Sequence, residues 1–330
     1  MDKSLSLGKL RGLQEIANPH GLFTITALDH RGSLKRAINS EDPKSVSYQQ
    51  MVDYKVKLLD ALAPHSSAIL IDPIFGAATA LKGGHISGTQ GFLVSLEATG
   101  YTDAEGDRVT TAADGWGVDK IKRMGASAVK ILLYYNPGSA TAEQQQEFIV
   151  QSAEDCRASD IPMLVEPMTY NIVDGPKKGT AEFAELKANM VIETARELCP
   201  LGIDVLKAEF PDDPDFEKDE GKMADHCKQL TEVAEVPWVL LSAGVGYDTF
   251  NLQTRLACEN GASGFLAGRA IWQEAPGLPE DEQEEFLTAT AVQRLEDLTS
   301  IANDSGRPWT SVYSGALDSV DVAEGWQARY

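Results

Sequence analysis

Short apolar runs alternate with amphipathic segments along the whole chain. Eight of the runs have the length and composition of buried strands, and they span residues 21–29, 67–72, 92–97, 127–135, 161–167, 203–209, 236–244 and 263–269. Helical patterns separate most of these runs, at 44–63, 115–125, 141–159, 180–199, 214–234, 247–260 and 280–303. The glycine-rich stretch 72–91 predicts a loop with at most a short helix. Strands that alternate with helices need right-handed crossovers, so the pattern predicts a parallel sheet.

Eight such units predict an α/β protein, a closed (β/α)8 TIM barrel with extra terminal helices, formed as a single domain over residues 1–330. Such barrels need about 250 residues, and the surplus falls in terminal helices and long loops. The competing architecture is a doubly wound open sheet. It is disfavoured because ALDHRG, rather than GxGxxG, ends the first strand, and because no P-loop consensus occurs.

Polar residues end every one of the eight predicted strands. In strand order they are Asp29 with Arg31, Asp72, Glu97, Lys130, Glu166, Lys207 with Glu209, Ser242, and Gly268 with Arg269. In a barrel of this kind the catalytic groups gather at the carboxyl ends of the strands. One charge there is usually a helix cap or a solvated loop residue. Polar ends of all eight strands that converge on one mouth predict a polar site, because buried charge is costly unless it is paired.

Two lysines interrupt apolar strands, Lys207 in IDVLKAEFP and Lys130 in SAVKILLYY. Buried lysines are rare, and an unprotonated one can attack a ketone to form a Schiff base. A neighbouring ammonium and removal from water favour the neutral amine of Lys207, whereas Asp29 and Glu166 oppose it. The alternative role for Lys130 is a salt bridge to Glu166 or Asp29, and both roles are compatible.

Glu166, in LVEP, is the candidate proton shuttle, because Schiff-base chemistry needs one positioned group that gives and takes protons. Its alternative role is that of a salt-bridge partner only.

Phosphate capture is predicted at the loops SAGVG (242–246) and AGRAIW (267–272), which follow the seventh and eighth strands. Ser242 offers a hydroxyl, Gly244 and Gly268 let the backbone approach an anion, and Arg269 offers a bidentate fork. The alternative is that these loops are only tight turns. Arg31 is a candidate for a second anionic group, or for an ion pair with Asp29 or Asp72.

The five histidines, His20, His30, His65, His85 and His226, form no HxH or HExxH pair. A metal site is therefore not predicted, nor is any other cofactor. Only His30 clearly borders a strand end. It is expected either to hydrogen-bond the substrate or to shape the first loop.

The composition of the chain limits the kinds of binding partner and the cellular compartment that we expect for this protein. A formal net charge of −21 argues against nucleic acid or an anionic membrane as partner, so an anionic substrate would need a positive field confined to the site. The N-terminus is too polar for a signal peptide, and no run of about 18 apolar residues could span a bilayer. The four cysteines form no CxxC pair and are predicted to be reduced thiols. We therefore expect a soluble, cytoplasmic protein.

With these residues in place, the chain resembles the tagatose 1,6-bisphosphate aldolase family, class I aldolases of (β/α)8 fold. The resemblance rests on motifs in the same order and spacing: ALDHRGSLKR, SLEATGY, AVKILLYYNP, LVEPMTY, DVLKAEFP, LLSAGV and GFLAGRAIW. It implies Lys207 as the Schiff-base lysine, Glu166 as the acid/base, and Asp29 and Lys130 as polar groups of the site. It also implies Arg31 as a substrate contact. Ser242, Gly268 and Arg269 would then form the dihydroxyacetone phosphate cradle.

The implied reaction is reversible cleavage of tagatose or fructose 1,6-bisphosphate to dihydroxyacetone phosphate and a three-carbon aldehyde. The family's DQRG stands here as DHRG, which leaves the contact of His30 open. The same family includes sulfofructose phosphate aldolases, so the distal group is phosphate or sulfonate. The motifs also leave open a regulatory phosphosugar-binding barrel with little turnover and a barrel isomerase or decarboxylase. Family members are commonly oligomeric, which makes a homo-oligomer an alternative to a monomer.

Overall fold

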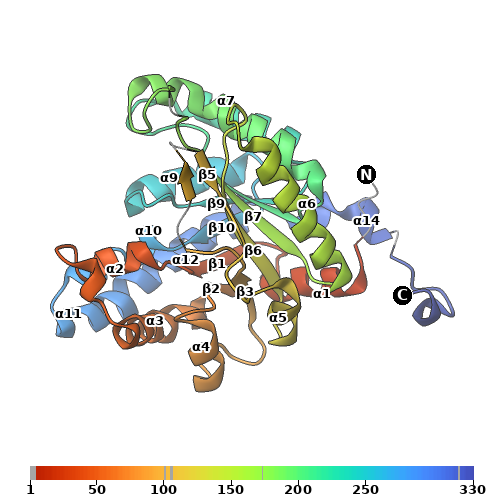
Figure 1. The fold of residues 1–330 in the computed structure, drawn as a ribbon, viewed down its shortest axis with the longest axis horizontal. Helices are drawn as coiled ribbons and strands as arrows, with labels where there is room; N and C mark the ends of the chain where they lie inside the picture. The colour runs from red at the N-terminus through yellow and green to blue at the C-terminus, as the bar shows by residue number, and fades with distance from the viewer. Residues whose placement is uncertain (1–4, 100–101, 105–106, 173, 319) are drawn as a thin grey trace.

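The eight predicted strands form one closed parallel barrel. The computed structural model describes residues 5–99, 102–104, 107–172, 174–318 and 320–330. The barrel strands are β1 (Phe23–Leu28), β2 (Ala68–Ile71), β3 (Gly91–Ser95), β6 (Ala128–Tyr134), β7 (Met163–Met168), β8 (Val205–Ala208), β9 (Trp238–Leu241) and β10 (Gly264–Ala267). Their order around the barrel is β1-β10-β9-β8-β7-β6-β3-β2 (Figure 1). The predicted TIM barrel is therefore confirmed, and the open sheet is excluded.

Most predicted helices are present, but those predicted to begin at residues 214 and 44 begin at Glu220 and Tyr48, whereas the other ends shift by three residues at most. They are α3 (Tyr48–Leu62), α5 (Val118–Arg123), α6 (Ala142–Ala158), α7 (Ala181–Leu198), α8 (Glu220–Ala234) and α9 (Tyr247–Glu259). Ser47 and Gln50 form a capping box that starts α3 where the apolar period begins. The predicted last helix is α11 (Glu280–Glu285), a π-helical stretch (Phe286–Ala291) and α12 (Val292–Ser305) in succession. The predicted loop 72–91 holds only the short α4 (Ala77–Gly83).

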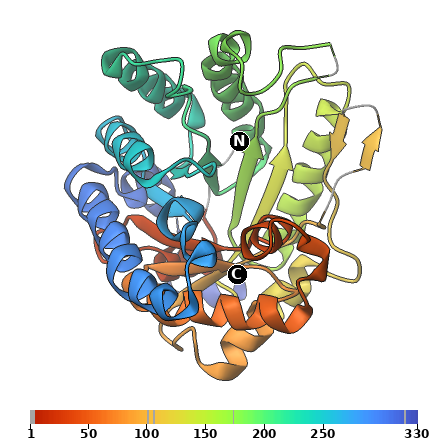
Figure 2. The same cartoon turned by 90° about the vertical axis from the view of Figure 1, so that its left-hand side faces the viewer.

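Several short elements were not predicted individually. They are α2 (Gly32–Ile38), α10 (Arg269–Trp272) and the hairpin of β4 (Thr102–Ala104) and β5 (Asp107–Val109). Each is too short to leave a readable period in the sequence. In Figure 2 the hairpin lies at the outer edge of the helical ring, beyond the barrel strands.

Terminal helices close the amino end of the barrel, as the surplus length predicted. α1 (Leu7–Ile16) packs against β2, β3 and β6, and α13 (Trp309–Val312) and α14 (Ser314–Asp318) follow α12. Figure 1 shows both chain ends on this side. No helix of the described residues is long and apolar enough to cross a membrane.

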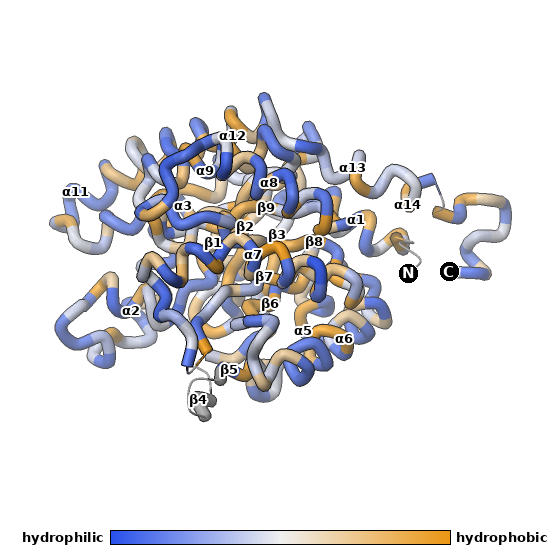
Figure 3. Tube along the Cα trace, turned by 90° about the horizontal axis from the view of Figure 1, so that it is seen from above, coloured by the Kyte–Doolittle hydropathy of each residue, from blue (hydrophilic) through white to orange (hydrophobic). Residues whose placement is uncertain are grey.

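The interior of the barrel changes from apolar to charged along its axis. Alternate residues of a strand face the same side, so Ala128 and Lys130 of β6 share the inner face, as do Val205 and Lys207 of β8. The first member of each pair belongs to the apolar interior, together with Leu93 and Leu266. Figure 3 shows hydrophobic positions gathered on the central strands. Because of this alternation both lysines point into the barrel, two residues closer to the carboxyl ends of the strands than Ala128 and Val205.

Candidate active site

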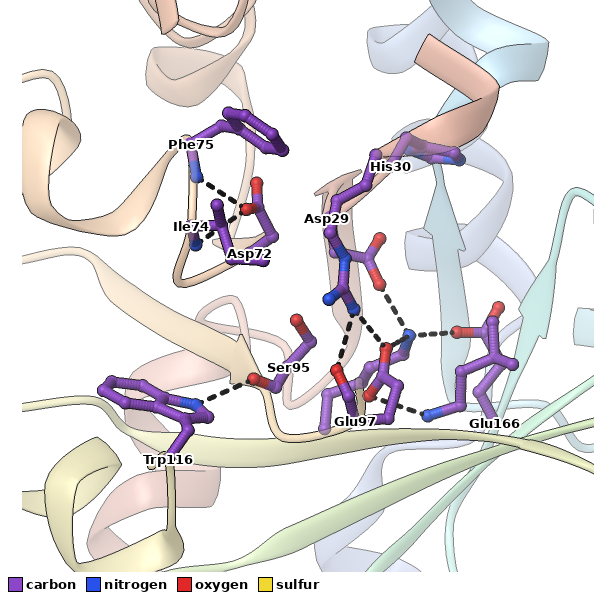
Figure 4. Close-up of polar contacts among 12 residues, drawn as sticks. Asp29, His30, Asp72, Ile74, Phe75, Ser95, Glu97, Trp116 and Glu166 are labelled. Atoms are coloured by element: carbon purple, nitrogen blue, oxygen red, sulfur yellow. Dashed lines mark hydrogen bonds and ion pairs between the residues drawn. The ribbon is translucent and has the colours of Figure 1, made fainter. Parts of the chain in front are cut away.

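Lys130 lies at the centre of a group of three carboxylates. Its ammonium is fully buried and stands 2.6 Å from Asp29 Oδ2, 2.9 Å from Glu166 Oε2 and 3.2 Å from Glu97 Oε1. Burial alone would lower the pKa of Lys130, but Asp29, Glu166 and Glu97 together raise that pKa well above its ordinary value. In Figure 4 the carboxylates of Asp29, Glu97 and Glu166 point toward one common nitrogen. Lys130 is thus held as a cation, and both ion pairs predicted for it are present.

Lys207 shares one of these carboxylates with Lys130. Its side chain is only 4% exposed, and its Nζ lies 2.9 Å from Glu166 Oε1. The two oxygens of Glu166 therefore face two different ammonium groups. Because β7 lies between β6 and β8 in the barrel, the carboxylate stands between the lysines of its two neighbouring strands. Lys207 and Glu166 line the cavity at the mouth, so both are open to a bound molecule.

Burial and charge act in opposite directions on the other two carboxylates. Burial would raise the pKa of Asp29, but Lys130, helped by Lys207, outweighs burial and lowers it below its usual range. For Glu97, burial prevails and raises the pKa, although Lys130 and Arg31 oppose it. Glu97 also accepts a hydrogen bond from the backbone N–H of Leu132 at 3.1 Å. The structure thus brings Glu97 into the centre, a role that the sequence analysis did not assign to it.

The cavity at the mouth encloses about 470 Å³ and carries more positive than negative groups. Its charged lining residues are Arg31, Arg36, Lys207 and Arg269 against Asp29, Glu97 and Glu166. The cationic Lys130 lies beside these carboxylates. A chain with a net charge of −21 therefore has a local excess of cations at this cavity. This is the local field that an anionic substrate requires.

The predicted anion cradle lines the same cavity. Ser242, Gly268 and Arg269 all contribute to its wall, and burial lowers the pKa of Arg269, opposed by Glu166. Ala243, which directly follows Ser242, has φ +48°, a left-handed conformation that is unusual for a residue with a Cβ. Gly244 follows with φ +84°. Two consecutive left-handed residues make the sharp turn that carries this loop back to α9.

Gly244 and Gly268 make room for side chains of the cavity wall. A Cβ on Gly244 would stand 2.7 Å from Cζ of Arg269, and one on Gly268 would stand 2.5 Å from Cε1 of His30. Gly244 itself does not line the cavity. The lack of a side chain at Gly244 thus leaves room for the guanidinium of Arg269, a contact that the sequence analysis did not foresee.

His30 forms part of the cavity wall as a neutral imidazole. Burial lowers its pKa to about 3, with Arg269, Lys55 and Lys207 adding to the effect and Asp29 opposing it. The ring meets Trp272 edge to face at 5.3 Å between centroids. Its Nδ1 is buried and has no hydrogen-bond partner. His30 therefore lies where it could contact a bound molecule, and its hydrogen bond to the substrate stays a prediction.

Arg31 pairs with a different carboxylate from those expected. Its Nη2 lies 3.2 Å from Glu97 Oε1 and donates to the Glu97 carbonyl at 3.0 Å, so the pairing is neither with Asp29 nor with Asp72. Its Nη1 is buried without a hydrogen-bond partner, as is the hydroxyl of Thr110. Both residues line the cavity. Thr110 was missed because it follows the short hairpin and belongs to none of the motifs.

Besides the fully buried Lys130, two of the predicted strand-end charges do not line the cavity. Asp72 pairs with Lys55 and accepts the backbone N–H groups of Ile74 and Phe75 (Figure 4). Glu209 accepts hydrogen bonds from Thr169 and Lys178. Each of these two carboxylates stands one residue beyond the end of its strand, β2 at Ile71 and β8 at Ala208, where the partners named above hold it. The four cysteines are free and buried. Among the described residues, no three or more His, Cys, Asp or Glu side chains are grouped to hold a metal ion.

The chain is a (β/α)8 barrel with buried lysines and carboxylates gathered at the carboxyl ends of its strands. A family model described as DeoC/LacD family aldolase matches residues 23–274. The chain therefore belongs to the DeoC/LacD family of aldolases, and the predicted enzyme class and family resemblance are confirmed.

Named relatives match nearly the whole chain. Tagatose 1,6-diphosphate aldolase 2 of Streptococcus agalactiae is 31% identical over 322 residues, which cover 91% of this chain and 97% of that protein. Tagatose 1,6-diphosphate aldolase of Lactococcus lactis is also 31% identical, over 92% of this chain and 97% of that protein.

Solved structures share the fold at lower identity. A Schiff base forming fructose-1,6-bisphosphate aldolase has a TM-score of 0.58 at 22% identity, over 85% of this chain and 97% of that one. Fructose-bisphosphate aldolase from Plasmodium falciparum has a TM-score of 0.67 at 14% identity, over 92% of this chain and 98% of that one.

Proposed function

We propose that this aldolase works through a Schiff base on Lys207 and cleaves a ketohexose 1,6-bisphosphate of the tagatose or fructose type. The products are dihydroxyacetone phosphate and a three-carbon aldehyde phosphate. One observation carries the proposal: the amine of Lys207 lines a positively charged cavity with its Nζ 2.9 Å from Glu166. The names of the relatives from Streptococcus agalactiae and Lactococcus lactis support this substrate class.

The chemistry begins with the transfer of a proton from Lys207 to Glu166. The neutral amine then attacks the C2 carbonyl, and Glu166 returns a proton to the departing hydroxyl so that water leaves and an iminium forms. A base takes the proton of the C4 hydroxyl, the C3–C4 bond breaks, and its electron pair moves into the iminium to give an enamine. Glu166 serves as that base because it faces Lys207 directly. Protonation at C3 and hydrolysis release dihydroxyacetone phosphate.

Lys130 and Asp29 hold the charges that this sequence of steps needs. Lys130 stays protonated between Asp29 and Glu166, and so keeps a positive charge beside the group that shuttles protons. A fixed cation of this kind stabilises negative charge as it develops and needs no rearrangement at the moment of reaction. Lys130 therefore keeps a positive charge next to Glu166, whereas Lys207 reacts with the substrate.

The two ends of the substrate bind on different parts of the wall. Ser242, Gly268 and Arg269 hold the phosphate next to the ketone, where Arg269 supplies a bidentate fork. The unpartnered Nη1 of Arg31 and hydroxyl of Thr110 receive the distal anionic group. His30 offers a neutral hydrogen-bonding ring beside Gly268. A distal sulfonate presents three similar oxygens. Comparing kcat/KM for the sulfonated and bisphosphorylated ketoses therefore decides the distal group.

The direct test is reductive trapping. Incubation with dihydroxyacetone phosphate and borohydride should leave a stable adduct on the peptide that contains Lys207, identified by mass spectrometry. The same treatment without the ketone is the control, and the cleavage activity should persist after treatment with a chelator. Absence of the adduct, together with loss of activity on chelation, would overturn the proposed mechanism.

The cradle gives a second expected result. Gly244→Ala should raise KM for the bisphosphate about tenfold and change kcat little, because the new Cβ would stand 2.7 Å from the Arg269 guanidinium and displace it, and because it strains a turn at φ +84°. Steady-state kinetics measures both constants. Gly246→Ala is the matched control, since a Cβ there meets nothing within 4 Å and its φ is −66°. Equal KM values for the two variants would contradict this role of Arg269.

A further inference from the structure

A further buried lysine, Lys55 on α3, lies next to the segment Asp29–Arg31 that follows β1. Its side chain is 1% exposed, and it does not line the mouth cavity. The ammonium donates to the carbonyl oxygens of Leu28 and His30, the latter at 2.9 Å, and pairs with Asp72 Oδ2 at 2.7 Å. An ammonium has three donors, and here three acceptors surround it. None of the steps proposed above uses this group.

The two carbonyls lie where the chain continues past the last residue of β1 that pairs with β2. The last paired position between β1 and β2 is Leu28 with Ile71, and His30 lies two residues beyond it. Past this point the ladder has no N–H groups of β2 to hold the chain of β1. Buried carbonyls need a donor, and the ammonium of Lys55 supplies it. Lys55 thus extends the support of β1 by two residues beyond the ladder.

Asp72 keeps the ammonium of Lys55 in place. Its carboxylate is completely buried, and its other oxygen accepts the N–H groups of Ile74 and Phe75 at 2.9 and 2.8 Å. The ion pair therefore joins the loop after β2 to α3 and, through Lys55, to the end of β1. This arrangement accounts for the strand-end carboxylate that does not face the cavity.

We propose that Lys55 is a positioning residue of the aldolase, which holds the Asp29–His30–Arg31 segment in its working place. The inference rests on the function proposed above. All three residues line the cavity, and Asp29 approaches Lys130 Nζ at 2.6 Å. Lys55 holds the carbonyls of residues 28 and 30, one on each side of Asp29. A shift of this backbone by about 1 Å would separate Asp29 from Lys130, and such misplacement costs on the order of 100-fold in rate.

The test is the double variant Lys55→Met/Asp72→Asn, which removes both charges together and so leaves no unpaired ion in the core. The amide oxygen introduced at position 72 can still accept the N–H groups of Ile74 and Phe75. We expect kcat to fall about 100-fold and the borohydride adduct on Lys207 still to form, because Lys207 itself is untouched. KM should rise by a much smaller factor, because Arg31 moves with the segment whereas Ser242 and Arg269 keep their places. A purely structural role would lower stability without this division between kcat and KM.

Two further variants make the result decisive. Lys187→Met is the matched control, because Lys187 is also buried and donates to a backbone carbonyl, that of Asp212 at 2.9 Å, yet lies outside the cavity. It should lose stability and keep kcat. If the double variant does not fold, Lys55→Arg decides, since it keeps the cation beside Asp72 but its planar fork cannot reproduce both carbonyl contacts. A folded Lys55 variant with wild-type kcat would overturn the inference. Failure of the wild-type protein to form the adduct would instead overturn the proposed function.

Discussion

Replacing Lys207 with methionine should lower kcat/KM for the bisphosphate by about 10,000-fold or more. Removal of the nucleophile of a covalent mechanism costs amounts of this order. Methionine has nearly the volume of lysine and suits a side chain that is 4% exposed, so the barrel should remain folded. Steady-state cleavage assays measure the loss, and borohydride with dihydroxyacetone phosphate should no longer label the protein.

The same substitution at Lys187 provides the control, since that residue is buried but lies outside the cavity. Its activity should match that of the unaltered protein. If Lys207→Met retained cleavage activity, the Schiff-base mechanism would be wrong.

Glu166→Gln should lower kcat by about 100-fold to 10,000-fold, the range that general acid–base catalysis contributes. The amide keeps the shape of the side chain but can neither take a proton from Lys207 nor return one. It also removes the negative charge between two ammonium groups that each stand 2.9 Å away. Both carbinolamine formation and C–C cleavage should therefore slow down. Single-turnover measurements should show a slower appearance of the trapped adduct as well as of the products.

Asp204→Asn is the matched control for this variant. Asp204 is a buried carboxylate on the same side of the molecule as α1, where it pairs with Lys9 at 2.8 Å. It lies outside the mouth cavity, so its substitution should lower the melting temperature but leave kcat unchanged. An equal loss of kcat in both variants would mean that Glu166 acts through stability rather than through proton transfer.

Much of this architecture could be predicted because the period of two along a strand is a local property. Once Ala128 and Val205 are assigned to the inner face, Lys130 and Lys207 must follow them there. The loops after β9 and β10 were likewise readable, because glycines in SAGVG and AGRAIW mark close approaches of the chain. The short α2 and the β4–β5 hairpin could not be read, because three to seven residues do not establish a period.

What the sequence by itself determined is that Lys130, Glu166 and Lys207 point into the barrel, and the end of the barrel at which they lie. Local alternation of apolar and polar residues suffices for both. Only the tertiary structure decided which charges meet. Closure of the barrel places Glu97 between Lys130 and Arg31, and it turns Asp72 toward Lys55 instead of the cavity. These pairings join residues far apart in the chain, and their free energy depends on distance and burial, which no local pattern records.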